Sequence, residues 1–365
     1  MIDCFDREIW DGAPREVELV YRVIQWGAGN NAQALIRAVH QHPDLELVGC
    51  RVWSEEKDGI DVGVLAGIGP IGISATSDAQ SLVDTDADVV LFLPAMLPDT
   101  TESDREAVEL LRSGKSVISL TGDHSMPAAA GNGFGEAVEE ACRIGDSTFT
   151  AAGVNPGFIA ERLAPTLTGL CADVTAVTIA ETYDCSNSTA ALLFDTMGFG
   201  LELKDWSPES PFAQMFNRAF RQVIYNMAAT FDIDLVDVKW SCEVIPAHRD
   251  ISVAGRVVSQ GTVAAISQVW ESVPKDSDSI ALKKVTQWAC SDDIPSVPVS
   301  RGWRVTITGK PNLVLNLETD PDDGTQFYAE NMVGAGIPMI PEVIKAAPGI
   351  LLPKIQAPFR RRFTG

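Results

Sequence analysis

An apolar segment, Tyr21–Trp26, runs directly into residues 27–32, which read Gly-Ala-Gly-Asn-Asn-Ala. In a strand–turn–helix of this kind the first glycine permits the tight turn, and the second lets the backbone approach a pyrophosphate. The N-terminus of the next helix offers unpaired N–H groups and a partial positive charge to phosphates. The motif in this context predicts a dinucleotide-binding turn, and an ordinary strand–turn–helix is the alternative. The expected cofactor contacts are Gly27, Ala28, Gly29, Asn30 and Asn31.

The end of the second expected strand, Leu45–Trp53, bears on which dinucleotide binds. NAD-binding enzymes usually carry an acidic residue there for the ribose 2′-hydroxyl. Here Ser54 can hydrogen-bond a 2′-phosphate, and Arg51 or Lys57 can neutralise it. The sequence therefore favours NADP. NAD stays possible because two glutamates follow Ser54, and a merely solvated loop is the further alternative.

Three more segments follow expected strands and are predicted to border the same crevice, since ligands of open parallel sheets bind at the carboxyl ends of the strands. Residues 92–96 follow a buried apolar strand, residues 120–124 follow the next one, and residues 153–158 end the nucleotide-binding half. The cofactor contacts expected from them are Pro94, Thr121 and Asn155.

The elements that must position these residues change in type along the chain. Strands and amphipathic helices alternate up to Gly157, which predicts a Rossmann-type parallel sheet. Long segments of alternating hydrophobicity then predict an open antiparallel sheet. The fold class expected is therefore α/β plus α+β. We place a dinucleotide-binding domain at 1–157 with an acidic extension at 1–19, a substrate-binding and dimerisation domain at 158–325, and a C-terminal helix and tail at 326–365 that packs back on the first domain.

Several single elements are predicted from local signals. Asp78 is expected to cap a short helix that ends at Val83. A short strand is expected at 71–75, one long alternating segment at 251–270, and helices at 104–112, 161–170 and 211–230. Residues 309–312 should form a hairpin turn. The last helix, 327–344, should kink at Pro338 and Pro341.

Composition excludes several classes of protein. The net charge of the 365 residues is −22, and the only clustered bases are Arg360, Arg361 and Arg362, so no nucleic-acid partner is expected. A negative chain also requires a locally positive phosphate site. No apolar run approaches the roughly 20 residues that span a bilayer, and the N-terminus lacks the pattern of a secretory signal. The 7 cysteines and 4 histidines show no metal-ligand spacing, which predicts reduced thiols, no metal and a cytoplasmic protein.

The sequence resembles the family of dihydrodipicolinate-reductase-like proteins, which includes 2,4-diaminopentanoate dehydrogenase and the native amine dehydrogenases. The resemblance rests on residues 21–32 and 42–49, and on shorter matches at Asp61-Val62-Gly63, at 113–115, at 153–158 and at Gly302-Trp303. The lysine and histidine motif of true dihydrodipicolinate reductases is not visible, so the amine-dehydrogenase branch fits better. This resemblance implies NAD(P)H-dependent interconversion of a ketone and ammonia with an amine, by a homodimer built through the antiparallel sheets.

The implied chemistry needs a carboxylate that deprotonates ammonium and stabilises an iminium cation. In the family a glutamate in the helix after the Phe92-type strand has this role, and counting back from Ser113-Gly114 matches it to Glu106. Glu102 is a rival because the preceding loop is longer than the family pattern. The structural alternative is a capping box, with Ser103 as N-cap and Glu106 reaching back to its N–H. If neither glutamate faces the pocket, ordinary carbonyl reduction becomes the better hypothesis.

The substrate pocket is expected to include side chains of the second domain. The predicted lining residues are Met96, Tyr183, Phe199 and His248, with Asp184 and Asn187 near them. The preferred function is reductive amination of a small ketone or aldehyde and its reverse. The alternatives are an NADP-dependent carbonyl or imine reductase that does not use ammonia, and a dinucleotide-binding sensor without turnover.

Overall fold

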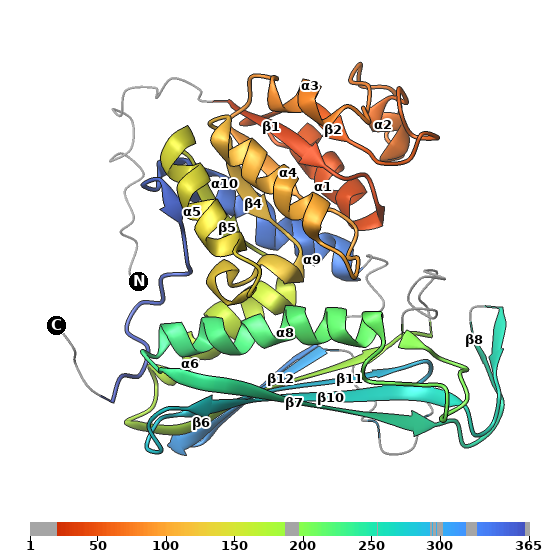
Figure 1. Cartoon of the computed structure of the whole chain (residues 1–365), viewed down its shortest axis with the longest axis vertical. Helices are drawn as coiled ribbons and strands as arrows, with labels where there is room; N and C mark the ends of the chain where they lie inside the picture. Colours follow the sequence, from red (N-terminus) through yellow and green to blue (C-terminus); the bar gives the residue numbers. More distant parts are fainter. Residues whose placement is uncertain are drawn as a thin grey trace, which may run out of the picture.

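The computed structural model describes residues 20–186, 197–253, 255–292, 294, 297, 302–318 and 327–361. Two sheets lie one above the other in Figure 1, and a long helix, α8 (Pro211–Thr230), runs between them. The N-terminal extension, Cys4, Asn187 and Arg362 lie outside the described residues.

The first sheet is wholly parallel. Its order is β14-β5-β4-β3-β1-β2, and each neighbouring pair is parallel. All four residues of β3 and of β4 are buried, as expected for strands covered on both faces. The strands are β1 (Tyr21–Trp26), β2 (Leu45–Arg51), β3 (Val89–Phe92), β4 (Ser116–Ser119), β5 (Thr148–Ala151) and β14 (Gly349–Ile350).

Helices cover both faces of this sheet. One face packs against α1 (Asn30–Gln41), α9 (Phe327–Gly336) and α10 (Ile340–Lys345), with α2 (Val62–Leu65) beside α1. The other face packs against α3 (Ala79–Val83), α4 (Thr101–Arg112) and α5 (Phe134–Gly145). The predicted interruption of the last helix is confirmed, because the 3-10 turn η5 (Ile337–Met339) separates α9 from α10.

The second sheet has the order β13-β12-β6-β11-β10-β7. The expectation of an antiparallel sheet needs one correction, since β6 and β11 pair in parallel while the other neighbours are antiparallel. A separate hairpin, β8 (Ile251–Val253) and β9 (Arg256–Val258), extends beyond the sheet. The six strands are β6 (Asp173–Asp184), β7 (Leu235–Pro246), β10 (Val263–Pro274), β11 (Ala281–Ala289), β12 (Gly302–Lys310) and β13 (Leu313–Glu318).

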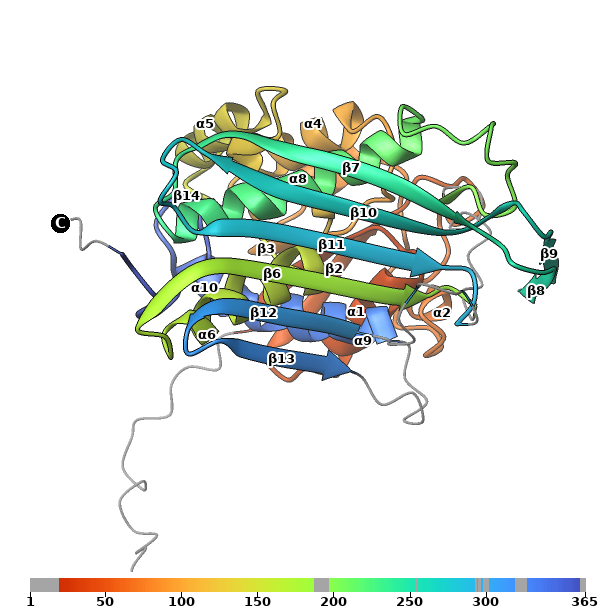
Figure 2. The same ribbon diagram turned by 90° about the horizontal axis from the view of Figure 1, so that it is seen from below.

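Helix α8 covers one face of the second sheet, and Figure 2 shows that none of the described elements covers the other face. Phe216, Phe220 and Val223 of α8 belong to the core between helix and sheet. The predicted bounds of α8 and the hairpin turn at 309–312 are confirmed. The opposite face of α8 points toward the first sheet and can contact the loops at the end of that sheet. This contact positions the candidate site.

Three local predictions were wrong. Residues 71–75 form only an isolated bridge to Asp61, and the segment 251–270 divides into β8, β9 and the start of β10. The helix expected at 161–170 is confirmed over residues 161–168, where the π-helical segment Val154–Leu163 continues into α6 (Ala164–Thr168). Helix α4 begins at Thr101 with Thr100 as N-cap, so Ser103 is not the cap and the capping box does not form. Asp78, by contrast, accepts hydrogen bonds from Gln80 N and Ser81 N and caps α3 as predicted.

Candidate cofactor and active site

The glycine turn after β1 has the geometry of a phosphate cradle. Gly27 has a φ of +108°, and a Cβ there would lie 2.3 Å from the carbonyl oxygen of Leu93, so only glycine fits. At Gly29, a Cβ would meet no protein atom within 4 Å. Gly29 is also the N-cap of α1, where no described side chain caps the helix and the first turn has no acidic residue. The open space and the uncapped N–H groups fit a pyrophosphate.

Lys57 adds positive charge to this turn. Its Nζ donates a hydrogen bond to the carbonyl oxygen of Ala28 at 3.1 Å. Ser54 is exposed at the same end of the first sheet. Lys57 therefore lies against the turn, in a protein whose net charge is strongly negative.

Arg51 is placed differently from the prediction. Its guanidinium is buried and pairs with Glu106, with Nη2 3.1 Å from Oε1. It also donates to the carbonyl oxygens of Val52 and Ser77, and it lies 5.0 Å from the ring centroid of Trp53. Because Glu106 neutralises this cation, Arg51 does not supply the free positive charge expected for a 2′-phosphate.

The two glutamates predicted to act in catalysis lie apart. Glu106 is 1% exposed, and both of its carboxylate oxygens are engaged, since Oε2 accepts from Trp26 Nε1 at 2.8 Å and Oε1 accepts from Arg51. Glu102 is exposed in the first turn of α4. The structure thus gives Glu106 partners under α4 and leaves Glu102 in solvent. A catalytic role for either residue stays a prediction.

The loop after β4 is bound by one face of α8. Arg218, Gln222 and Asn226 stand at i, i+4 and i+8 of this helix. Arg218 Nε donates to Asp123 Oδ1 at 2.9 Å, Gln222 Nε2 to the Asp123 carbonyl oxygen at 2.6 Å, and Asn226 Nδ2 to the Ser125 carbonyl oxygen at 2.9 Å. The second domain therefore fixes a loop at the carboxyl end of the first sheet.

Asp123 is a functional candidate that the sequence analysis did not name. It lies in the 3-10 turn η1 (Gly122–His124) and is 5% exposed. Burial raises the pKa of its carboxyl above the ordinary value of 3.8, although the bond from Arg218 opposes this shift. Residues 120–124 were already expected at the crevice. The acidic side chain within this segment was the signal that could have identified Asp123.

His124 anchors the same loop from beneath. Its Nδ1 lies 2.8 Å from Ser119 Oγ and its Nε2 lies 3.0 Å from Asp104 Oδ1. Its ring stacks on Phe134 with centroids 4.4 Å apart. Burial raises the pKa of Asp104, but the bonds from His124 and its neighbours outweigh burial and lower it overall. Asp104 therefore stays ionised as the acceptor for His124.

Asn155, a predicted cofactor contact, belongs to a buried polar network after β5. Its Nδ2 donates to Glu181 Oε2, which also accepts from Lys284 Nζ at 3.0 Å. Lys284 is fully buried, and burial lowers its pKa although Glu181 opposes the shift. Two other predicted contacts, Pro94 and Thr121, are buried at the ends of β3 and β4.

Three of the four predicted substrate residues pack on the second-domain core. Met96 and Tyr183 pack against the second-domain core, and Tyr183 meets Trp288 edge-on with ring centroids 6.2 Å apart. Phe199 is buried within that core at 8% exposure. His248 is exposed just beyond β7.

In the part of the chain that the structure describes, no group of three or more His, Cys, Asp or Glu side chains could hold a metal ion. None of the described helices is long and apolar enough to cross a membrane. The six cysteines found in this part of the chain are free thiols.

The chain is similar to known dehydrogenases along most of its length. It is 25% identical over 348 residues to an amine dehydrogenase of Streptomyces virginiae, covering 90% of this chain and 93% of that protein. The fold matches the structure of an amine dehydrogenase from Mycobacterium smegmatis with a TM-score of 0.75 at 19% identity, covering 92% of this chain and 97% of the other. A biliverdin reductase from Synechocystis, solved with biliverdin and NADP+, has a TM-score of 0.52 at 12% identity, covering 91% of this chain and 93% of the other.

The match to a known family lies in the second domain. Residues 158–359 match the family described as the 2,4-diaminopentanoate dehydrogenase C-terminal domain. This match spans more than half of the chain and agrees with the glycine turn of the first domain. The chain therefore belongs to the 2,4-diaminopentanoate dehydrogenase C-terminal domain family and is an NAD(P)-dependent dehydrogenase.

Proposed function

We propose that this dehydrogenase catalyses reductive amination of a small ketone or aldehyde with ammonia, and the reverse oxidative deamination. The observation that carries the proposal is the similarity to an amine dehydrogenase over 90% of the chain, together with a buried carboxylate at the carboxyl end of the parallel sheet. The balanced reaction joins the carbonyl compound, ammonia, NADPH and a proton to give the amine, NADP+ and water.

We propose NADP as the preferred cofactor, with NAD possible. Lys57 against the glycine turn and the exposed Ser54 support this choice, because both side chains can hydrogen-bond a 2′-phosphate. The bound dinucleotide supplies the hydride in reduction and accepts it in oxidation. The protein's own contribution is to bind the phosphates and to orient the carbonyl carbon.

We assign the acid–base role to Asp123. A carboxyl whose pKa is raised by burial can both take a proton from ammonium and return one to the departing water. Its ionised form also stabilises an iminium cation near the end of β4. Arg218 positions the carboxylate through the 2.9 Å hydrogen bond from α8.

An assay with NADPH, a panel of ketones, and ammonium present or absent tests the function. Turnover that requires ammonium supports reductive amination. Ammonium-independent turnover would favour the carbonyl or imine reductase, and tight cofactor binding without turnover would favour the sensor.

Substitution of Asp123 tests its role. Asp123→Asn should lower kcat by at least about 100-fold, a typical contribution of general acid–base catalysis, while NADPH binding is retained. Asp237→Asn is the matched control, because Asp237 accepts from Arg221 on the same helix but is 54% exposed. Loss of activity in both variants alike would contradict the assignment.

We also propose a cytoplasmic homodimer formed through the uncovered face of the second sheet. Val314 is 54% exposed, while its neighbours Leu313 and Leu315 pack on the core side. An apolar side chain on this face fits a buried interface. Val314→Lys should shift the molecular mass in solution from dimer to monomer, and an unchanged mass would contradict this interface.

A further inference from the structure

Glu161 is an acidic residue that the proposed chemistry does not use, and it is only 1% exposed. It lies in the π-helical turn that follows β5. Its Oε2 accepts a hydrogen bond from the backbone N–H of Gly157 at 2.7 Å. Its Oε1 is buried and has no hydrogen-bond partner among the described residues. Since buried polar atoms are nearly always hydrogen-bonded, this oxygen requires an explanation.

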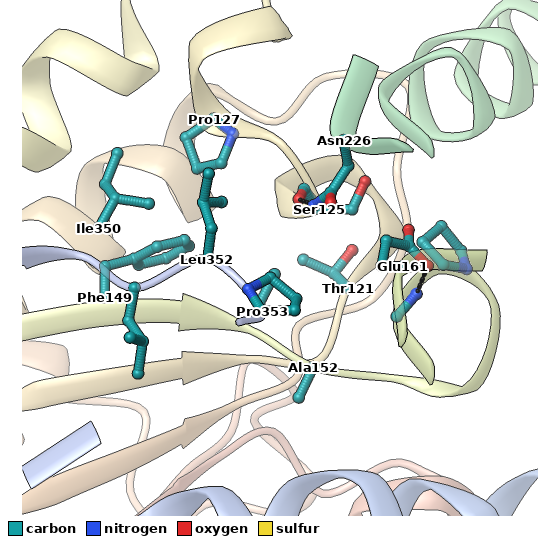
Figure 3. Close-up of a pocket in the computed structure, with 14 residues that line it drawn as sticks. Thr121, Ser125, Pro127, Phe149, Ala152, Glu161, Asn226, Ile350, Leu352 and Pro353 are labelled. Carbon is teal, nitrogen blue, oxygen red and sulfur yellow. Dashed lines mark hydrogen bonds between the residues drawn. The ribbon is translucent and has the colours of Figure 1, made fainter. Parts of the chain in front are cut away.

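A second buried polar atom without a partner lies at the same place. Ser125 Oγ is buried and unbonded within the described part of the chain. Figure 3 shows Ser125, Glu161, Thr121 and Asn226 among the residues that line one pocket. The cavity has a volume of about 10 Å³. That volume is about the size needed for a single water molecule. The remaining lining is formed by the ends of β5 and β14, by Pro127, Pro156 and Gly157, and by residues 351–353.

We propose that this cavity binds one ordered water molecule, which bridges Glu161 Oε1 and Ser125 Oγ. The water then joins the loop after β4, which contains Thr121, to the segment after β5, which contains Asn155. Both loops border the expected cofactor crevice. Glu161 acts as a positioning residue, holding Gly157 directly and Ser125 through the water. The water site itself does not depend on which substrate or dinucleotide the enzyme uses.

The charges around Glu161 make its protonation state part of this arrangement. Burial raises its pKa from 4.5 to about 7, and the bond from Gly157, Lys284 on β11 and the adjacent Arg162 oppose the shift. Glu181 on β6 already pairs with Lys284 at 3.0 Å. The other lining residues, from the loop after β4, from α8 and from the chain after β14, are uncharged. The water donates to the ionised carboxylate and accepts from the protonated acid, so it serves both states.

Crystallography of the full chain tests the water directly. The wild-type protein should show one density peak within hydrogen-bond distance of Glu161 Oε1 and Ser125 Oγ. Ser125→Ala should remove the peak or leave it weakly occupied, because one of its two anchors is lost. Glu161→Gln should keep it, since the amide still offers a polar group. An empty cavity in the wild-type structure would overturn the proposal.

Thermal unfolding across pH 5 to 8 tests the proton on Glu161. A carboxyl with a folded pKa above its unfolded value loses stabilising free energy as pH rises between the two values. The Tm of Glu161→Gln minus the Tm of wild type should therefore rise between pH 5 and 7 and level off above. Glu140→Gln, on an exposed helix face, should follow the wild type. A Tm difference for Glu161→Gln that does not change with pH would show that Glu161 binds no extra proton in the folded state.

Discussion

Arg51 Nη2 and Glu106 Oε1 lie 3.1 Å apart in an ion pair whose side chains are 7% and 1% exposed. The pair joins the end of β2 to the second turn of α4, and Trp26 Nε1 binds the other carboxylate oxygen. The sequence position of Arg51 predicts a cofactor contact, and the family resemblance predicts a catalytic role for Glu106. In the structure the charges of these two side chains neutralise each other. The ion pair predicts a role in stability for both residues, which can be measured separately from any role in catalysis.

Removal of the carboxylate from this pair should destabilise the fold. Glu106→Ala leaves a buried guanidinium unpaired, which typically costs about 3–5 kcal/mol. Glu102→Ala is the control and should change the free energy of unfolding by less than about 0.5 kcal/mol, because Glu102 is exposed. Urea denaturation measures both. If Glu106→Ala unfolds like the wild type but has no turnover, Glu106 acts in the chemistry after all.

The two glycines of the turn should respond oppositely to one methyl group. Gly29→Ala meets no protein atom within 4 Å and has an ordinary φ of −76°, so it should lose no more than the ~1 kcal/mol that alanine costs at an N-cap. The methyl group would instead meet the pyrophosphate, and NADPH affinity should fall at least about tenfold, or ~1.4 kcal/mol.

Gly27→Ala places its Cβ against the Leu93 carbonyl oxygen at a φ of +108°, so it should lose about 1–3 kcal/mol of stability. Fluorescence titration and denaturation of the two variants separate the effects. Unchanged NADPH affinity in Gly29→Ala would place the phosphates elsewhere.

Cofactor choice should depend on Ser54 and Lys57. Ser54→Glu introduces a negative charge where the 2′-phosphate is proposed, so NADPH should bind about tenfold more weakly while NADH is little affected. Lys57→Met should weaken both cofactors, because its ammonium rests on the turn itself at Ala28. Dissociation constants for NADPH and NADH in each variant give the ratio. An unchanged ratio in Ser54→Glu means that the phosphate contact lies at another residue.

Asp61 should contribute stability that disappears in acid. Hydrogen bonds from the backbone N–H groups of Ile71, Gly72, Gly63 and Val64 lower the pKa of its carboxyl below 3.8, against a smaller effect of burial. A lowered folded pKa means that the stabilising free energy is present above the unfolded value and is lost as pH falls through the folded value. Asp61→Asn should therefore be less stable than wild type at pH 7, and the two should converge in acid.

Denaturation at several pH values measures this convergence. Asp84→Asn provides the comparison, since Asp84 Oδ1 accepts a hydrogen bond from the side-chain amide of Gln80 at 2.9 Å. A gap between Asp61→Asn and wild type that persists at low pH would mean that ionisation of Asp61 does not matter for folding.

Local structure could be predicted where neighbouring residues decide it. The glycine turn, the Asp78 cap and the 20-residue helix α8 agree with the sequence patterns, because φ preferences, capping and apolar periodicity act within a few residues. The capping box failed because Glu106 finds Trp26 and Arg51, which lie outside its own helix. The contacts of the buried Glu106 side chain with β1 and β2 outweighed the short-range hydrogen bond of a capping box.

The sequence by itself determined the Rossmann-type half, the position of the cofactor turn and the family resemblance. Only the tertiary structure decided that Arg51 pairs with Glu106 and that Asp123 meets Arg218. The tertiary structure also paired β6 with β11 in parallel and placed Glu161 beside an internal cavity. The physical reason is that such partners are brought together by sheet order and by the packing of α8 between the sheets. Neither of these leaves a periodic signal in the chain.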